Sequence, residues 1–345
     1  MEAPKSASSG TSSPSDQGDA RGFDLQNYQD QVGLRSREET PLEDVLLETL
    51  TDKDCDVYNL SQGQRLAVIF NHTFYLNNHM EPRQGSDNDA QAIKQVFEPL
   101  QFHVQELTNP TVNQILNKLY EIQKLPDLSC LALFILTHGE ADGLLHAWDN
   151  CYNLSKTIIP EIQPDVCPSL AGRPKMIFIQ ACQGEETDSG VMVKLSRHRH
   201  TSADSSRMSP NAAYCIPNYC DMLIFSAAYS GHYSFRSPSK GSWFIQALCK
   251  EIENADPDQE LISVLTKVSR SVALNKTSNC PNHPRFHGKK QVPLKQDTLL
   301  RKIYLKEPSK VTITTKEADH AHEDIKNKSN LTIDALKREH NCLCM

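Results

Sequence analysis

Two short apolar runs end in residues that can carry chemistry, and they constrain the fold more than any other feature of the chain. Residues 176–179 read Met-Ile-Phe-Ile and lead to Cys182. Residues 131–137 read Leu-Ala-Leu-Phe-Ile-Leu-Thr and lead directly to His138. Continuous apolar runs of this kind are typical of strands buried on both faces of a mostly parallel sheet. The sequence therefore predicts an α/β fold in which two strands end in a cysteine and a histidine.

The positions of Cys182 and His138 predict nucleophilic chemistry. Parallel neighbours bring their carboxyl ends to one edge of a sheet, and ligands bind outside that edge in open α/β folds. An imidazole beside a thiol lowers its pKa or accepts its proton, which produces a thiolate nucleophile. Each residue alone has a simpler interpretation, as an inert buried cysteine or a hydrogen-bonded histidine at a strand end. The two motifs together favour catalysis.

The sequence Gln-Ala-Cys-Gln-Gly around Cys182, with His138 44 residues upstream, resembles the signature of the caspase family of cysteine proteases. The resemblance covers residues 59–305 and implies the caspase fold, a three-layer α/β sandwich in which helices flank a central, mostly parallel β-sheet. It implies that Cys182 attacks the peptide carbonyl and that His138 protonates the leaving amine. Backbone N–H groups of Gly139 and Cys182 would form the oxyanion hole. By position, the carbonyl of Glu81 would support His138.

The resemblance also implies that protein substrates carry aspartate at P1. A buried carboxylate is best held by guanidinium groups, which form two parallel hydrogen bonds that lysine cannot supply. Arg83 and Arg236 stand in contexts that match the two pocket arginines of the family, and Gln180 matches the pocket glutamine. The positions that match the S2 and S4 subsites are Tyr233, Phe235 and Trp243.

Maturation in this family is a cleavage after aspartate between a large and a small subunit. The resemblance divides the chain into a large catalytic subunit at 58–188, a linker at 189–210 and a small subunit at 211–306. Asp188, within Glu-Glu-Thr-Asp-Ser, is the preferred processing site, and Asp204 is the second candidate. The chain is thus expected to be a zymogen that an upstream caspase activates.

Composition limits the folded part of the chain and its partners. Apolar residues make up 38% of the 345, which is enough for one core but low for a chain that folds throughout. Residues 1–57 begin with a stretch rich in Ser, Gly, Asp and Pro, so they are predicted to form a disordered prodomain, and residues 307–345 to form a polar tail. The net charge of −7 argues against nucleic acid as a main partner.

Cysteine usage and the ends of the chain predict a cytoplasmic protein. The eleven cysteines lack framework spacing and no secretion signal precedes them, which implies reduced thiols. The short leader favours an effector-type caspase acting in apoptosis. The family resemblance adds a homodimer of large/small subunit pairs and inhibitor-of-apoptosis proteins as partners. No cofactor is expected, because thiolate chemistry needs neither metal nor nucleotide.

Two weaker motifs carry separate hypotheses. Cys280, His283 and His287 have metal-ligand spacing, but no second pair lies nearby, so no metal site is predicted. The last four residues fit the C-a-a-X form, which makes Cys342 a candidate for prenylation and membrane association. The basic segment 194–200 is interpreted as a solvated part of the linker.

The remaining patterns outline the rest of the fold. Asp87 is the expected N-cap of a helix, and Pro110 is expected at the start of the next. The further strands are predicted at 65–71, 102–107, 221–227 and 301–305, and the helices at 87–100, 110–122, 243–254 and 260–274.

Two alternative functions stay open at this stage. One is a catalytically idle caspase homologue that regulates an active partner. Loss of Cys182, His138 or either pocket arginine would have indicated it, and all are present. The other is an inflammatory or differentiation protease with the same chemistry, which the sequence does not separate from an apoptotic one.

Overall fold

A six-stranded sheet forms the centre of the molecule, with the spatial order β10-β7-β6-β3-β1-β2. The computed structural model describes residues 55–76, 80–190 and 217–306. All neighbouring strands pair in parallel except β10, which runs antiparallel to β7. The strands are β1 (Gln64–Asn71), β2 (Phe102–Thr108), β3 (Leu128–Leu136), β6 (Lys175–Gln180), β7 (Met222–Ser226) and β10 (Leu294–Asp297).

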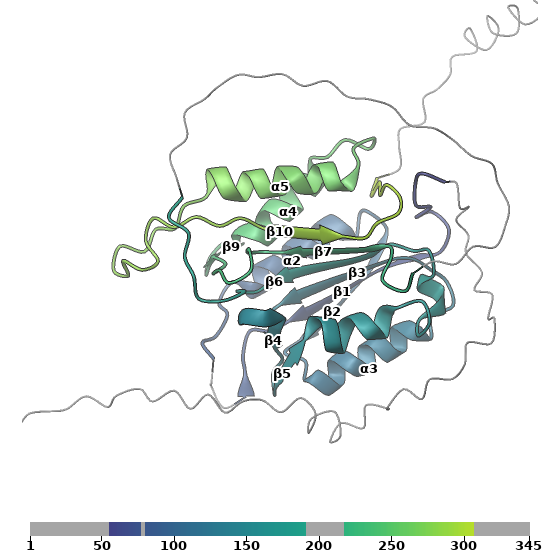
Figure 1. Cartoon of the computed structure of the whole chain (residues 1–345), viewed down its shortest axis with the longest axis horizontal. Coiled ribbons are helices and arrows are strands. Elements are labelled where there is room, and N and C mark those ends of the chain that lie inside the picture. Colours follow the sequence, from purple (N-terminus) through teal and green to yellow (C-terminus); the bar gives the residue numbers. More distant parts are fainter. Residues whose placement is uncertain (1–54, 77–79, 191–216, 307–345) are drawn as a thin grey trace, which may run out of the picture. The chain divides into compact units, whose positions relative to one another are not determined.

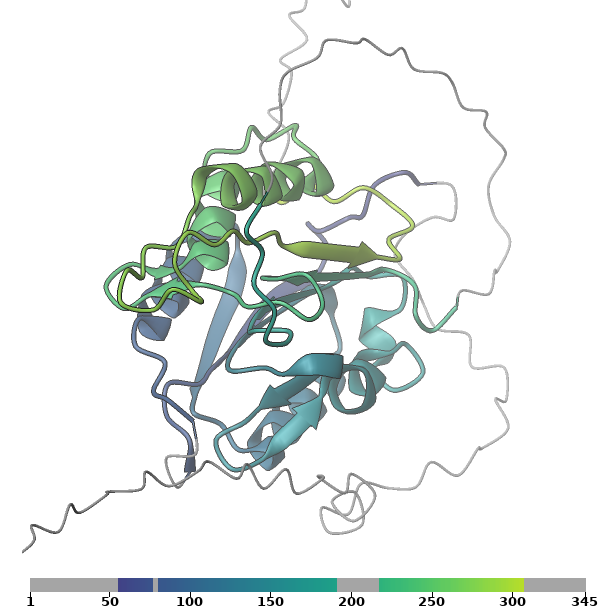
Figure 2. The same cartoon turned by 60° about the vertical axis from the view of Figure 1, so that its left-hand side comes forward.

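The central strands are apolar because both faces of the sheet are covered. Every residue of β3 and β6 is buried, as expected for parallel strands between two layers of helices. One face packs against α2 (Ser86–Phe97), α4 (Trp243–Glu253) and α5 (Leu261–Asn275) in a single apolar cluster. Figure 2 shows α4 and α5, in green, packed together on that side. The predicted three-layer α/β sandwich is confirmed.

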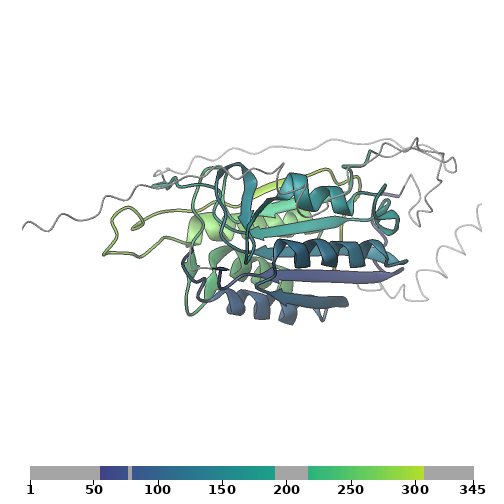
Figure 3. The same cartoon turned by 90° about the horizontal axis from the view of Figure 1, so that it is seen from below.

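The opposite face is covered by α3 (Val112–Gln123) and short helical turns. A complete capping box starts α3, because the Thr111 hydroxyl accepts the Gln114 N–H and the Gln114 side chain accepts the Thr111 N–H. Figure 3 shows β1 and β2 side by side at one edge of the sheet. The short turns are Ala141–Gly143, Leu154–Ile158, Ile159–Ile162 and Pro168–Leu170.

Two small hairpins lie outside the main sheet, and both position residues of interest. The first joins β4 (Leu144–His146) to β5 (Cys151–Asn153), and the second joins β8 (Arg236–Ser237) to β9 (Gly241–Ser242) (Figure 1). The antiparallel pairing of β8 with β9 leads directly into α4, whose N-cap is Ser242.

Two local predictions are wrong. Asp87 does not cap α2: Gly85 is the N-cap, with φ 85°, and the Asp87 carboxylate accepts from Asn71 instead. A Cβ at position 85 would lie 2.6 Å from the Ser237 carbonyl oxygen, so only glycine fits this turn. Pro110 likewise precedes the helix by two positions, since α3 begins at Val112.

The predicted strand at 301–305 is also wrong. Ile303 and Leu305 are buried, but in this segment only Lys302 pairs, in a single parallel bridge with Val57. The last strand of the sheet is β10, whose sequence Leu-Lys-Gln-Asp is polar because it lies at the edge and none of its four residues is buried. Alternate residues of the segment 301–305 are therefore buried although the segment does not pair as a strand.

Candidate active site

The register of the central strands brings His138 and Cys182 to the same level at the carboxyl edge of the sheet. Leu136 of β3 pairs with Gln180 of β6, and each candidate residue follows its strand by two positions. The two chain segments pack closely beyond the ladder, because a Cβ at Gly139 would lie 2.5 Å from the carbonyl oxygen of Cys182. This close approach is the physical reason for glycine after His138.

His138 is held from two sides. Its Nε2 lies 2.8 Å from the Glu81 carbonyl oxygen, so Nε2–H donates and Nδ1 carries the lone pair. Its backbone N–H donates to the Tyr75 hydroxyl at 3.0 Å, and that hydroxyl lies 2.9 Å from Thr137 Oγ1. Burial lowers the pKa of His138 to about 4, although the hydrogen bond to the Glu81 carbonyl acts in the opposite direction. The imidazole is therefore neutral at neutral pH. The predicted contact with Glu81 is present.

Cys182 is half-buried and its sulfur faces Ser234. Sγ lies 3.7 Å from the Ser234 hydroxyl and 3.9 Å from its carbonyl oxygen. Within the described residues, no hydrogen bond joins Cys182 to His138. Hydrogen bonds between catalytic groups are commonly long before substrate binds, so the free imidazole Nδ1 and the thiol remain compatible with a dyad.

Two backbone donors at this edge are free. Among the described residues, no acceptor takes the N–H of Gly139 or of Cys182. Free N–H groups beside a nucleophile are the donors that an oxyanion hole requires. The structure thus places both predicted donors next to each other, at the point where the segments after β3 and β6 meet.

Arg83 is the most unusual group of the site. It is 1% exposed, and its Nη1 donates to the His72 carbonyl at 2.8 Å and to the Ser86 hydroxyl at 2.6 Å. Its Nε and Nη2 have no hydrogen-bond partner among the described residues. Burial lowers the pKa of the guanidinium to about 10, so it stays charged at neutral pH. A buried cation with two unused donors is expensive unless an anion binds there.

The other predicted pocket residues converge on the same place. Gln180 Nε2 donates to the Ser234 hydroxyl at 3.0 Å, while its buried Oε1 has no partner among the residues that the structure describes. Arg236 Nε donates to the carbonyl of Gln84, which neighbours Arg83 in the chain, at 2.8 Å. Besides burial, the positive charge of Arg236 lowers the pKa of Arg83, which indicates that the two cations are close.

Two of the three aromatic residues predicted for the subsites line a cavity of about 180 Å³. Tyr233 and Phe235 line it, and Trp243 stacks behind Phe235 with ring centroids 4.8 Å apart. Tyr233 packs edge-to-face against Phe286 at 5.1 Å. Residues 186–188 line the same cavity, so the segment that contains Asp188 lies against the subsite residues.

Asp188 is held in place by backbone hydrogen bonds. Its carbonyl accepts the Lys290 N–H at 2.8 Å, and its carboxylate accepts the Gly190 N–H at 2.7 Å. The second predicted processing site, Asp204, and the prenylation candidate, Cys342, lie outside the described residues.

Sequence reasoning missed two residues of the site. Tyr75, in the loop after β1, fixes the backbone of His138, and Ser234 contacts both Cys182 and Gln180. A tyrosine outside any helix or strand pattern gives no sequence signal of burial, and a serine just before Phe235 gives no signal of its own.

The metal-like spacing near residue 280 has a structural explanation. The Cys280 N–H donates to His287 Nδ1 at 3.2 Å, which closes the loop. Across the residues that the structure describes, no group of three or more His, Cys, Asp or Glu side chains could hold a metal ion. The described helices also include none that is long and apolar enough to cross a membrane.

Comparisons with known proteins agree with this geometry. The caspase domain family matches residues 64–304. "Caspase-1" of Spodoptera frugiperda is 36% identical over 254 residues, which are 72% of this chain and 81% of that protein. "Caspase drICE" of Drosophila melanogaster is 35% identical, over 71% of this chain and 70% of that protein. The crystal structure of Spodoptera frugiperda caspase-1 superposes with a TM-score of 0.68 at 31% identity, and covers 76% of this chain and 98% of the other.

Proposed function

The chain belongs to the caspase family, and from that premise we propose that it is an endopeptidase that cleaves protein substrates after aspartate. The observation that carries the specificity is Arg83, a fully buried guanidinium whose Nε and Nη2 find no partner in the part of the chain that the structure describes. An aspartate carboxylate fills this requirement, because it accepts two parallel hydrogen bonds from one guanidinium. Arg236 adds a second positive charge, which strengthens the preference for an anion.

The mechanism follows from the residues at the sheet edge. As Sγ of Cys182 attacks the carbonyl carbon of the scissile bond, Nδ1 of His138 takes the thiol proton, and the N–H groups of Gly139 and Cys182 stabilise the oxyanion that forms. His138 then protonates the leaving amine and later activates the water that releases the acyl-enzyme. Glu81 and Tyr75 hold the ring and backbone of His138 in one orientation during these steps.

Activation by linker cleavage is the second part of the proposal. Glu186 and Asp188 pair with His232 and Lys290, next to the aromatic subsite residues. Cleavage after Asp188 or Asp204 by an upstream caspase would release this segment from the subsites. The large subunit would then comprise residues 58–188 and the small subunit residues 211–306.

A homodimer of such subunit pairs fits the free edge of the sheet at β10. Antiparallel pairing of two copies centred on Gln296 would place Lys295 of one opposite Asp297 of the other, which is a favourable cross-strand charge pair. We extend the proposal to an effector role in apoptosis on the sequence resemblance. A cytoplasmic location is consistent with the cysteines of the described residues, which are all free thiols.

The test is turnover of fluorogenic tetrapeptides with Asp, Glu or Asn at P1, by the purified chain and by Cys182→Ala. The proposal predicts turnover of Asp peptides only, lost in the variant, with self-processing at Asp188 or Asp204. Absence of turnover after an added protease has cut the linker would instead support the idle regulatory homologue. Equal turnover of Glu peptides would retain the protease and contradict the pocket of Arg83 and Arg236.

A further inference from the structure

A second cysteine–histidine pair lies on the β4–β5 hairpin, next to the candidate active site. Cys151 Sγ is 3.3 Å from His146 Nδ1, and His146 Nε2 is 2.9 Å from Glu140 Oε1. His146 and Cys151 face each other in the antiparallel ladder of the hairpin. Glu140 lies in the turn that precedes the hairpin, so Glu140, His146 and Cys151 form one hydrogen-bonded triad.

The polarity of this chain of groups matches that of an activated nucleophile. The Glu140 carboxylate accepts from Nε2–H of His146, which leaves the lone pair on Nδ1. That lone pair accepts the S–H of Cys151. A nucleophile bonded to a base, which a third group orients, is the arrangement that activates thiols and hydroxyls in covalent catalysis.

We propose that Cys151 is a second reactive thiol of this protein, activated by His146 and Glu140, which forms mixed disulfides with low-molecular-weight disulfides such as oxidised glutathione. The site is accessible, since Cys151 is only half-buried. The His146 side chain is 12% exposed and that of Glu140 is 57% exposed, so the base is sheltered and its carboxylate partner faces solvent.

The resting sulfur is a protonated thiol, so reaction depends on the neighbouring base. Burial, followed by the negative charge of Glu140, raises the pKa of Cys151 to about 11. The fully buried Cys130 also has its pKa raised, to about 12, by burial. Only Cys151 of these two has a histidine to take the proton as the sulfur attacks.

The exchange balances with the disulfide as the only co-reactant. Nδ1 of His146 takes the thiol proton while Sγ of Cys151 attacks one sulfur of the small disulfide. The new sulfur–sulfur bond forms as the old one breaks, and the departing thiolate takes the proton from His146. Cys151 is oxidised to the mixed disulfide, and half of the small disulfide is reduced to a thiol.

Modification at Cys151 reaches His138 through the hairpin backbone. The His146 N–H donates to the His138 carbonyl at 3.1 Å, and the Thr137 hydroxyl donates to the His146 carbonyl. The Tyr75 ring stands edge-on to His146 and also contacts His138. A substituent on Sγ removes the S–H and displaces the His146 ring. The mixed disulfide at Cys151 therefore lowers peptide turnover, a consequence that rests on the proposed protease function.

The first arm of the test measures labelling and needs no protease activity. The full-length Cys182→Ala chain is treated with oxidised glutathione, and each cysteine is followed by peptide mass spectrometry. Cys151 is expected to be modified while Cys130 and Cys249, which are buried, are not. His146→Gln should slow the reaction of Cys151 by about tenfold or more, since general-base assistance contributes at least that much.

Matched variants keep this arm decisive. Glu140→Gln keeps the shape of the hairpin and should also slow labelling of Cys151, whereas His287→Gln, beside Cys280, should not change it. An unmodified Cys151, or a rate that neither His146→Gln nor Glu140→Gln reduces, would overturn the proposal.

The second arm measures turnover. The wild-type chain is protected at Cys182 by a reversible aspartyl peptide aldehyde, treated with oxidised glutathione, and freed of the aldehyde by dialysis. Turnover should fall and return on addition of dithiothreitol, whereas Cys151→Ser should keep its turnover. Equal losses in both chains would overturn the coupling to His138. A chain without any turnover would contradict the proposed protease function. The labelling arm would still show whether Cys151 is a reactive thiol.

Discussion

The two ends of the central sheet differ in how far their buried polar groups are hydrogen-bonded. Within residues 55–76, 80–190 and 217–306, three groups at the carboxyl edge lack hydrogen-bond partners. They are Nε and Nη2 of Arg83, Oε1 of Gln180 and both ring nitrogens of the fully buried His72. At the amino-terminal ends of β6 and β7, Asp221 is equally buried but bonded on both carboxylate oxygens, by the Tyr58 hydroxyl at 2.6 Å and the Cys220 thiol at 3.0 Å.

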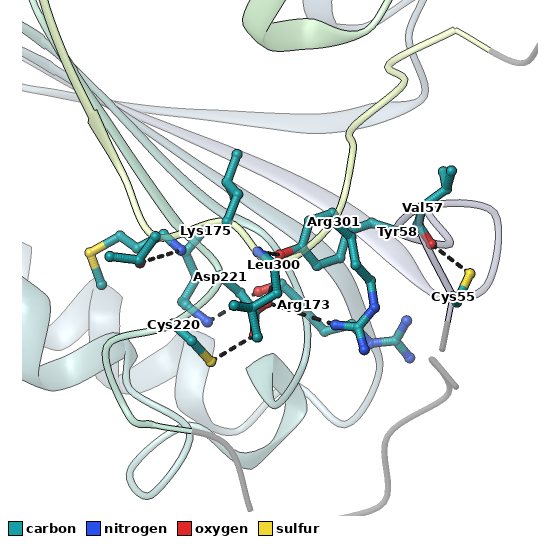
Figure 4. A network of polar contacts seen from close by, with 12 residues as sticks. Cys55, Val57, Tyr58, Arg173, Lys175, Cys220, Asp221, Leu300 and Arg301 are labelled. Carbon is teal, nitrogen blue, oxygen red and sulfur yellow. Dashed lines mark hydrogen bonds and ion pairs between the residues drawn. The ribbon is translucent and has the colours of Figure 1, made fainter. Parts of the chain in front are cut away.

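The network around Asp221 joins segments from both sides of the predicted linker (Figure 4). Arg301 Nη1 lies 4.0 Å from the carboxylate, and the Lys175 N–H donates to the Asp221 carbonyl at 2.8 Å. The Leu300 N–H donates to the Tyr58 hydroxyl at 3.0 Å. Buried polar groups cost free energy when they lack partners, so the bonded end stabilises the fold and the unbonded end is available to a ligand.

The largest effect expected at the unbonded end is the loss of the nucleophile. Cys182→Ala should lower turnover of an aspartyl peptide by at least about 10⁴-fold, because removal of a nucleophile removes the covalent pathway. The midpoint of urea unfolding should stay close to that of the wild type. Cys280→Ser is the matched control and should keep full turnover; a similar loss there would remove the basis for assigning Cys182.

The next effect concerns the unpaired guanidinium. Arg83→Lys keeps the positive charge but loses the bidentate geometry, so kcat/KM for aspartyl peptides should fall about 10²-fold. The control is Arg173→Lys, a change of a buried arginine near the other end of the sheet, which should leave kcat/KM unchanged. Unchanged kcat/KM in Arg83→Lys would show that the free donors do not serve the substrate.

A change at the bonded end should affect stability instead of turnover. Asp221→Asn removes the charge but keeps the shape, and asparagine tolerates the φ of 59° found there. The free energy of unfolding should fall by about 3 kcal/mol, because the buried Arg301 loses its counter-ion. Tyr58→Phe should cost about 1 kcal/mol. Both are read from urea unfolding, and a loss of kcat/KM in the folded variants would contradict the division between the two ends.

A smaller effect than that of Asp221→Asn is the pH dependence that His72 adds at the unbonded end. Burial lowers its pKa to about 3 from 6.5 in the unfolded chain, so below pH 6.5 the unfolded state takes up a proton that the folded state refuses. The free energy of unfolding should therefore fall as pH drops through this window, by about 2 kcal/mol between pH 7 and 5 from this group. His72→Gln should show a shallower fall in the same urea titrations; an identical slope would exclude His72 as a cause.

Much of the fold could be predicted because the central strands are uniformly apolar. The runs that became β1, β3 and β6 are buried along almost their entire length, so their sequence alone indicates their layer. The edge strand β10 could not be predicted in this way, since its polar sequence reflects pairing with β7 and not burial. The cap of α2 depended on a left-handed glycine packed against a distant loop, which no local pattern reveals.

The candidate site could be predicted only in part, because the pairing register of the strands decides which of its residues lie close together. The residues Arg83, Gln180 and Arg236 were named from a family resemblance, and the structure gathers them; their roles stay predictions. The hydrogen bond between Cys151 and His146 depends on the pairing of two three-residue strands, which carry no periodic signal of their own.

The comparison of kcat/KM for two tetrapeptides that differ only in Asp or Asn at P1 tests the central claim most directly. The two side chains are nearly isosteric, so the ratio measures what the buried, unpaired donors of Arg83 gain from a carboxylate. The aspartyl peptide is expected to be preferred by roughly 10³-fold or more, because the asparaginyl peptide leaves a buried cation without its anion. Similar values for the two peptides would show that the donors of Arg83 do not form a carboxylate site.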